Sequence, residues 1–170
     1  MLKQLLSESG LTLAVAESLT GGLLASRITS VSGASAYFKG GLVAYTIESK
    51  VELLGVDGQK AAECNCVSPL VAVQMAEGVR KLFGADIGVA TTGYAESYPR
   101  DDGTLGTPIA YIAVSLPYDR IETGFIAIDM PLTRQQMQER VAETALELML
   151  EELAGLTSPS QLAYISGAGI

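Results

Sequence analysis

The stretch AVAESLTGGLLASRI, residues 14–28, changes from a strand pattern to a helix pattern within a few residues. Its start is apolar, as in a strand buried on both faces of a sheet, and its end has apolar residues at helical spacing. Between them lies a turn with two hydroxyls and two glycines, formed by Ser18, Thr20, Gly21 and Gly22. Ligands of α/β sheets bind beyond the carboxyl ends of the strands, so we expect this turn to border a pocket.

The rest of the chain alternates between helix and strand patterns. We expect helices over residues 2–9, 20–30, from about 48, 69–83 and from 133 onward, and strands over 11–15, 41–46, 85–93, 108–116 and 120–130. The segments 32–41 and 94–107 are polar or rich in Gly, Pro and Asp, and are predicted to be loops. This order predicts one α/β domain, an α/β/α sandwich with a mixed sheet over residues 1–155, and a C-terminal tail over residues 156–170.

The composition is that of a folded, acidic domain. Of the 170 residues, 48% are hydrophobic and 18% are charged, and the net charge is −8. Lysine and arginine form no cluster, so the main source of nucleic-acid affinity is missing and we expect no nucleic-acid partner. No apolar run is long enough to span a bilayer, and the N-terminal residues lack the apolar region of a signal peptide. We therefore expect a cytoplasmic protein with no membrane partner.

The chain contains no histidine. This excludes Ser-His-Asp and Cys-His catalytic arrangements and the usual imidazole-rich metal sites. The only cysteines, Cys64 and Cys66, are too few for a zinc site and too close for an ordinary structural disulfide, so we expect two reduced thiols. We therefore expect no metal and no cofactor, and any catalytic base must be another residue type.

Four separated segments occur in the order of a known family: AESLTGGLLASRIT, SGASAYFKGGLVAYTIESK, VSPLVAVQMAEGVR and ADIGVATTG. Together they resemble the C-terminal domain of the competence/damage-inducible protein CinA, also found as the free-standing nicotinamide-nucleotide amidase PncC. The resemblance runs from about residue 11 to residue 150. It implies an α/β/α fold and hydrolysis of the carboxamide of nicotinamide mononucleotide to nicotinate mononucleotide and ammonia, by a serine nucleophile with a lysine base.

The resemblance also implies which residues form the site. The family's nucleophilic serine falls on Ser18, and its tyrosine and lysine fall on Tyr45 and Lys50 of YTIESK. Its late-strand hydroxyl residue falls on Thr92, and the arginine that opens its last helix falls on Arg134.

A site of this kind is chemically coherent without histidine. A desolvated lysine has a lowered pKa, so Lys50 can accept the serine proton, and Tyr45 would relay or orient that proton. The backbone N–H groups of Gly21 and Gly22 would hold the developing oxyanion. Arg134, or the N-terminus of its helix, would meet the nucleotide phosphate.

Thr20 and Gly93 complete the expected substrate-binding set. Each candidate also has a purely structural interpretation: Ser18 or Thr20 as a helix cap, Lys50 as a solvated lysine, Tyr45 as a core residue, Thr92 as a strand-end hydroxyl and Arg134 as a surface charge. The ordered motifs together favour the site.

Several positions depart from the family pattern. Ile47 replaces an asparagine, Leu19 replaces a cysteine, and Glu96 and Ser97 stand where the family has Gly and Pro. Three functions therefore stay open: an amidase acting on nicotinamide mononucleotide, a Ser/Lys hydrolase of another small amide, and a catalytically silent binding or assembly domain.

The same loop carries three acidic residues, Glu96, Asp101 and Asp102. We expect them to lie at the mouth of the pocket and to weaken nucleotide binding; the alternative is that they point into solvent and are screened.

The apolar composition and a pocket near helix ends are compatible with a homo-oligomer.

Overall fold

The computed structural model describes residues 2–100, 102–118, 120–128 and 132–156. A five-stranded sheet of order β2-β1-β3-β6-β7 lies at its centre. The strands are β1 (Leu13–Glu17), β2 (Phe38–Val43), β3 (Ile87–Tyr94), β6 (Ile109–Ser115) and β7 (Ile121–Ala127). β1 runs parallel to β2 and β3, whereas β6 runs antiparallel to β3 and β7. The sheet is therefore mixed, as predicted.

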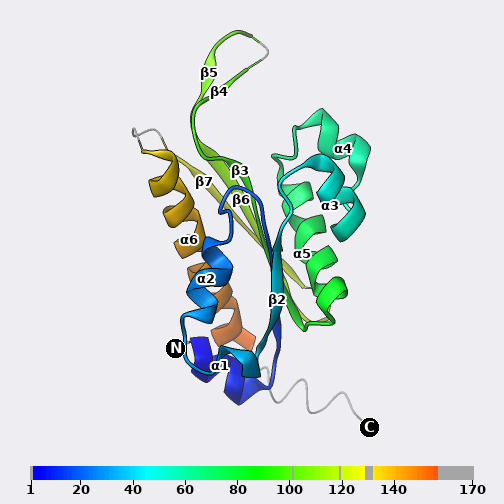
Figure 1. Ribbon diagram of the computed structural model, residues 1–170, viewed down its shortest axis with the longest axis vertical. Coiled ribbons are helices and arrows are strands. Elements are labelled where there is room, and N and C mark those ends of the chain that lie inside the picture. The colour runs from blue at the N-terminus through cyan, green and yellow to red at the C-terminus, as the bar shows by residue number, and fades with distance from the viewer. Residues whose placement is uncertain (1, 101, 119, 129–131, 157–170) are drawn as a thin grey trace.

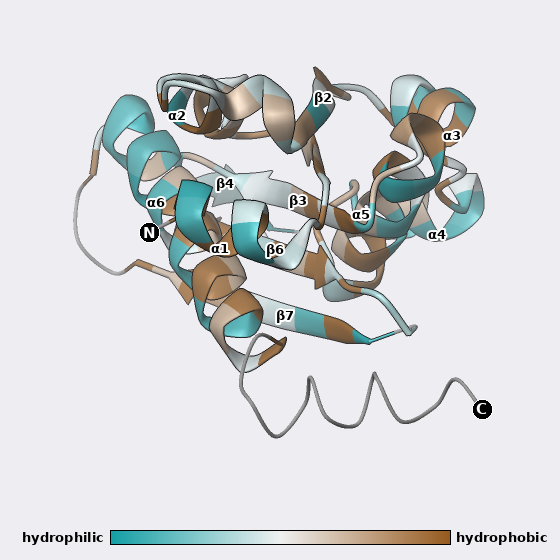
Figure 2. Ribbon diagram, turned by 90° about the horizontal axis from the view of Figure 1, so that it is seen from below, coloured by the Kyte–Doolittle hydropathy of each residue, from teal (hydrophilic) through white to brown (hydrophobic). Residues whose placement is uncertain are grey.

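Helices cover both faces of this sheet (Figure 1). They are α1 (Leu2–Ser9), α2 (Leu23–Thr29), α3 (Ile47–Leu54), α4 (Gly58–Glu63), α5 (Pro69–Phe83) and α6 (Arg134–Leu156), with a short 3-10 helix, η1, at Ala34–Ala36. One layer holds α1, α2 and α6, and the other holds α3, α4 and α5. Figure 2 shows the sheet between the two layers from below, with the mostly hydrophilic α4 on the outside. The predicted α/β/α sandwich is confirmed.

Strand β1 is buried along its whole length because it contributes to both halves of the core. Leu13 and Val15 pack in the apolar cluster that includes α1, α2 and α6, while Ala14 and Ala16 pack in the cluster that includes α5. Alternate side chains of a strand point to opposite faces. The apolar run at the start of the quoted stretch therefore faces a helix layer on each side.

On the α5 side the strands carry small residues, and the helix lies very close to them. A Cβ atom at Gly88 of β3 would collide with the carbonyl oxygen of Ala76 on α5. Only glycine permits this approach of helix backbone to strand backbone. The close packing sets the height of α5 over β3, and with it the position of the segment that leads into α5.

Most elements begin within two residues of the predicted positions, but two begin three residues away. The helix expected from residue 20 begins at Leu23, because Gly22 has φ 104° and ends the preceding turn in a left-handed conformation. The strand expected from residue 41 begins at Phe38, within the predicted polar loop. It continues through Gly40 and Gly41, where a Cβ atom would collide with the side chains of Phe83 and Val15 respectively. The glycines that suggested a loop are instead required by close packing.

The predicted loop 94–107 contains two short strands, β4 (Tyr98–Pro99) and β5 (Leu105–Gly106), which pair antiparallel. This hairpin projects from the body of the molecule beyond the end of β3 (Figure 1). Helix α4 was also not expected from the sequence. By contrast, the helix predicted over residues 69–83 is confirmed, and the helix predicted from residue 133 begins at Arg134. Ser68 caps α5, and Thr133 and Gln136 form the reciprocal capping bonds at the start of α6.

Helix α6 ends at Leu156. Apart from that residue, the tail predicted over 156–170 lies outside the described residues. Among the helices that the structure describes, none combines the length and apolar character needed to cross a bilayer.

Candidate active site

A cavity of about 360 Å³ opens where three neighbouring parallel strands end. Its lining comes from the residues that follow β1 and β2, from the last residues of β3 and the first of the hairpin, from the connection between α4 and α5, and from the start of α6. This is the edge at which the sequence predicted a pocket. Of the predicted site residues, Ser18, Tyr45, Lys50, Thr92, Gly93 and Arg134 line the cavity, whereas Thr20, Gly21 and Gly22 do not.

The turn after β1 is held by Glu17. This carboxylate is 1% exposed and accepts three backbone hydrogen bonds, from Gly22 (2.9 Å) and Leu24 (3.1 Å) to Oε2 and from Ala25 (2.8 Å) to Oε1. It therefore satisfies the free N–H groups at the start of α2, which a negative charge suits best. Sequence reasoning missed this role of Glu17. The available signal was an acidic residue at the end of a buried strand and just before a helix.

Ser18, the next residue, meets Lys50 at the bottom of the cavity. Lys50 Nζ donates hydrogen bonds to Ser18 Oγ (3.1 Å) and to the carbonyl oxygens of Ala44 (2.8 Å) and Tyr45 (3.4 Å). Lys50 is 1% exposed, although lysine is among the residues least often buried. The alternative interpretation of Lys50 as a solvated lysine is therefore wrong.

Helix α3 delivers Lys50 to this position. Thr46 caps the helix by accepting a hydrogen bond from Ser49 N (3.2 Å), and Ser49 Oγ accepts one from Thr46 N (3.1 Å). This reciprocal pair fixes the angle between the end of β2 and the first turn of α3. The long lysine side chain can then run back toward β1, whose register with β2 aligns Glu17 with Val43.

Burial lowers the pKa of the Lys50 ammonium below its ordinary value, and the nearby Cys66 acts in the opposite direction. Burial raises the pKa of the Cys66 thiol, so this neighbour is a neutral thiol near pH 7. A buried lysine with a lowered pKa loses its proton more readily than an exposed one. The neutral amine, which is the form that can act as a base, therefore forms more readily at Lys50 than at an exposed lysine.

The two carbonyl oxygens define the direction of that base. An ammonium group has three N–H donors, and Lys50 directs them to Ala44 O, Tyr45 O and Ser18 Oγ. When Lys50 loses one proton, the two carbonyls can accept only from the remaining N–H groups. The lone pair of the amine then faces Ser18 Oγ, which is the geometry that proton transfer from the hydroxyl requires.

Three threonines tie β1, β3 and the α4–α5 connection together. Thr20 and Thr91 share a buried hydrogen bond of 2.7 Å between their hydroxyl groups, and Ser18 N donates to Thr91 O (3.1 Å). The hydroxyl of Thr92 donates to the carbonyl oxygen of Cys66 (2.7 Å). Thr20 therefore supports the turn from behind, and Thr92 holds a wall of the cavity.

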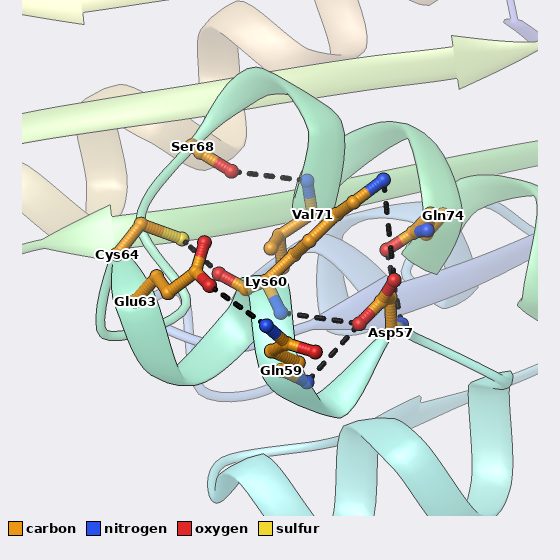
Figure 3. A network of polar contacts seen from close by, with 8 residues as sticks. All are labelled: Asp57, Gln59, Lys60, Glu63, Cys64, Ser68, Val71 and Gln74. Carbon is orange, nitrogen blue, oxygen red and sulfur yellow. Dashed lines mark hydrogen bonds and ion pairs between the residues drawn. The ribbon is translucent and has the colours of Figure 1, made fainter.

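The segment held by Thr92 is anchored from both ends (Figure 3). Asp57 caps α4 by accepting from the backbone of Gln59 (3.0 Å) and Lys60 (3.1 Å), and Ser68 caps α5 by accepting from Val71 N (3.2 Å). Cys64 donates its thiol hydrogen back to Lys60 O (3.1 Å). Asn65 and Cys66, between these anchors, have positive φ angles of 48° and 62°. Both cysteines are free, as expected.

The glycines of the turn do not present free N–H groups to the cavity. Gly21 N donates to Ser18 O (3.2 Å), and Gly22 N donates to the carboxylate of Glu17. Their predicted role as oxyanion donors therefore conflicts with the geometry, because both N–H groups already have partners. What the glycines supply is backbone conformation, with φ of 62° and 104°.

The N–H groups of Leu19 and Thr20, directly after Ser18, donate to no acceptor in the part of the chain that the structure describes. Leu19 lines the cavity. Gly93 forms another part of the wall, and a Cβ atom there would collide with the carbonyl oxygen of Ile109. The backbone of Leu19 and Gly93 therefore forms part of the cavity wall close to Ser18.

At the mouth of the cavity, Arg134 contacts two side chains. Its Nη2 donates to the hydroxyl of Tyr45 (2.6 Å), and its Nη1 donates to Glu96 Oε2 (3.0 Å). The Tyr45 side chain is 56% exposed and its hydroxyl lies against Arg134. Tyr45 reaches Lys50 through its carbonyl oxygen instead, so the structure does not place its hydroxyl in the expected proton relay.

The hairpin contributes aromatic side chains and one acid to the cavity. The rings of Tyr94 and Tyr98 stack with centroids 4.0 Å apart, and Asn65 Nδ2 donates to the Tyr94 hydroxyl (2.8 Å). Glu96 lines the cavity, but Asp102 does not: it accepts two hydrogen bonds from Thr104 in the turn between β4 and β5, which lower the pKa of its carboxyl. Asp101, the third acid, lies outside the described residues. In the described chain, no three His, Cys, Asp or Glu side chains gather as a metal site.

The sequence model of the CinA C-terminal domain matches residues 1–153. The CinA-like protein of Frankia casuarinae is 41% identical over 164 residues, which are 96% of this chain and 37% of that protein. The CinA-like protein of Chlorobium limicola is 42% identical over 161 residues, 94% of this chain and 38% of that protein. The chain therefore spans less than two fifths of the length of either relative.

Solved structures of the same superfamily share the fold. The competence damage-inducible protein A of Klebsiella pneumoniae superposes with a TM-score of 0.81 at 28% identity, covering 90% of this chain and 92% of that one. The CinA superfamily protein of Enterobacter cloacae superposes with a TM-score of 0.80 at 27% identity, covering 89% of this chain and 88% of that one. Family match, sequence identity and fold agree, and this chain belongs to the CinA C-terminal domain family.

Proposed function

We propose that this chain hydrolyses the carboxamide of nicotinamide mononucleotide to nicotinate mononucleotide and ammonia, with Ser18 as the nucleophile and Lys50 as the general base. The observation that carries the proposal is the buried Lys50 amine, 3.1 Å from Ser18 Oγ at the bottom of a cavity. Serine is a weak nucleophile unless a base within hydrogen-bond reach accepts its proton. Lys50 is a base within that reach, and burial lowers its pKa.

In the first step, neutral Lys50 accepts the proton of Ser18 as Oγ attacks the carboxamide carbon. The tetrahedral intermediate collapses when Lys50 returns this proton to the leaving nitrogen, so that ammonia departs and an ester to Ser18 remains. In the second step, Lys50 accepts a proton from water, and the resulting hydroxide attacks the ester carbonyl. The proton then returns to Ser18 Oγ and the carboxylic acid is released.

The oxyanion of each intermediate requires hydrogen-bond donors near Ser18. We assign this role to the N–H group of Leu19, which lines the cavity and has no acceptor within the described chain, in place of those of Gly21 and Gly22. The N–H of the residue after the nucleophile plays this part in other serine hydrolases with a strand–turn–helix nucleophile. One such donor contributes about 3 kcal/mol to transition-state stabilisation.

Arg134 is the proposed contact for the substrate phosphate. It lies at the mouth of the cavity and its guanidinium is oriented by the Tyr45 hydroxyl at 2.6 Å. A planar guanidinium can pair with two phosphate oxygens at once. Thr92 and Gly93 shape the wall between the mouth and Ser18, and Thr20 holds the turn. We also propose that the protein is located in the cytoplasm. We further propose that it assembles as a homo-oligomer, and light scattering would measure its oligomeric state.

The test is ammonia release from nicotinamide mononucleotide and from a panel of small uncharged amides, with wild type and Ser18→Ala in parallel. We expect release from the nucleotide by wild type alone. If ammonia is released only from other amides, the chain is a Ser/Lys hydrolase whose substrate is not nicotinamide mononucleotide. Binding of the nucleotide without any turnover would favour a catalytically silent binding domain, the second candidate, which the engagement of Arg134 by Glu96 supports.

A further inference from the structure

The mouth of the cavity carries a balanced pair of charges. Among the described lining residues, the charged side chains are Lys50 at the bottom and Glu96 and Arg134 at the mouth. Arg134 Nη1 and Glu96 Oε2 form an ion pair of 3.0 Å. The only positive group that the mouth offers to an incoming anion, within the described chain, is therefore already engaged by a carboxylate of the same protein.

This pair is built so that it can exchange. The Arg134 and Glu96 side chains are 44% and 60% exposed, and ion pairs between exposed side chains contribute little to stability. Tyr45 holds the other guanidinium nitrogen, Nη2, at 2.6 Å, so Arg134 can keep its orientation when Glu96 leaves. A phosphate group with two negative charges forms stronger, bidentate bonds to a guanidinium than a single carboxylate oxygen does.

We propose that Glu96 is a specificity-determining residue, which acts as an internal competitor for the anionic group of the substrate on Arg134. This inference rests on the proposed function and deepens it: a phosphate-bearing amide must displace Glu96, whereas an uncharged amide reaches Ser18 with the pair intact. Glu96 therefore weakens the affinity for nucleotides and leaves the chemistry at Ser18 unaffected. It sets KM for phosphate-bearing substrates and not kcat.

The variant Glu96→Gln keeps the size of the side chain and removes its charge. We expect it to lower both Kd and KM for nicotinamide mononucleotide by about two- to fivefold, the range expected for loss of one exposed ion pair. We expect kcat to be unchanged, and Kd for nicotinamide riboside, which lacks the phosphate, to be unchanged as well. In an Arg134→Gln background, the same substitution should have no effect on nucleotide binding.

Asp102→Asn is the matched control. It removes one negative charge from the same hairpin at a residue that does not line the cavity. We expect it to leave Kd for the nucleotide unchanged at 0.15 M salt, because charges on this surface are screened over roughly 8 Å. An equal effect of Asp102→Asn and Glu96→Gln would overturn the proposal in favour of a general field effect.

Kd is measured by titration calorimetry in the Ser18→Ala background, so that binding does not depend on turnover. If the wild type releases ammonia but Glu96→Gln leaves the Kd for the nucleotide unchanged, this inference is overturned and the amidase function stands. Tighter nucleotide binding in Glu96→Gln without ammonia release by the wild type would support the inference and remove the amidase function. Equal tightening for the riboside would also overturn the inference, because the effect would not involve phosphate.

Discussion

Lys50 Nζ donates a hydrogen bond of 3.1 Å to Ser18 Oγ, and the two side chains come from segments 32 residues apart in the chain. The contact forms because β1 and β2 are parallel neighbours whose carboxyl ends lie at the same edge of the sheet. One strand ends in the turn that carries Ser18, and the other leads into the helix that carries Lys50. The proposed nucleophile and its proposed base thus meet without a third residue such as histidine.

Replacing Ser18 by alanine removes the proposed nucleophile. We expect ammonia release to fall by about 10⁴-fold or more, as in other hydrolases that lose a nucleophile. The hydroxyl contributes little packing, so the free energy of unfolding should change by no more than about 1 kcal/mol. Turnover and thermal unfolding are measured on the same preparation. Retained turnover in a folded variant would exclude Ser18 as the nucleophile.

The rate should depend on pH through Lys50. Because burial lowers the pKa of this ammonium from its ordinary 10.5, kcat/KM should rise with pH and level off below pH 10.5. The measurement is a pH–rate profile for ammonia release. A rate that does not vary with pH on the alkaline side of neutrality would contradict the role of Lys50 as a base.

Stability should reveal the same shift independently of activity. Between the lowered folded-state pKa of Lys50 and 10.5, the unfolded chain binds more protons than the folded one, so rising pH favours the folded state. In Lys50→Met this contribution is absent. The difference in Tm, wild type minus Lys50→Met, should therefore increase as pH rises from 7 toward 10.5. A constant difference would show that the lysine pKa is the same in both states.

Glu17 should be a determinant of stability more than of chemistry. Glu17→Gln has one acceptor oxygen left for three backbone N–H groups, and we expect it to lower the free energy of unfolding by about 2 kcal/mol. Glu8→Gln, an exposed change of the same type, is the control and should change it by less than about 0.5 kcal/mol. Urea unfolding measures both. Equal stability of the two variants would contradict the capping role.

Thr92→Val tests whether the Thr92 hydroxyl holds the cavity wall. The change leaves the Cys66 carbonyl oxygen without its 2.7 Å hydrogen bond, and should destabilise the protein by about 1–2 kcal/mol. Thr29→Val is a matched control, because among the described residues the Thr29 hydroxyl bonds only to carbonyls of its own helix. It should cost less than about 0.5 kcal/mol. A Thr92→Val variant as stable as Thr29→Val would show that the Cys66 carbonyl finds another partner.

Much of this protein follows from local patterns in its sequence. The alternation of helices and strands predicts the mixed α/β sandwich, which is confirmed. The strand predicted over residues 11–15 is present but shifted to Leu13–Glu17, and the helices predicted over 69–83 and from 133 begin at Pro69 and Arg134. Side-chain periodicity and capping depend on neighbours within a few residues, so they can be recognised from the chain alone. The motifs with Ser18 and Lys50 likewise indicate which residues meet.

Only the tertiary structure decided how those residues are used. The sequence suggested N–H groups of Gly21 and Gly22 as oxyanion donors, but Glu17 and Ser18 O already accept from them. It suggested the Tyr45 hydroxyl as a proton relay, but that hydroxyl lies on Arg134. A hydrogen bond forms only when donor and acceptor lie about 3 Å apart and in a suitable direction. The partner of each N–H or O–H group therefore depends on which segments the fold brings together.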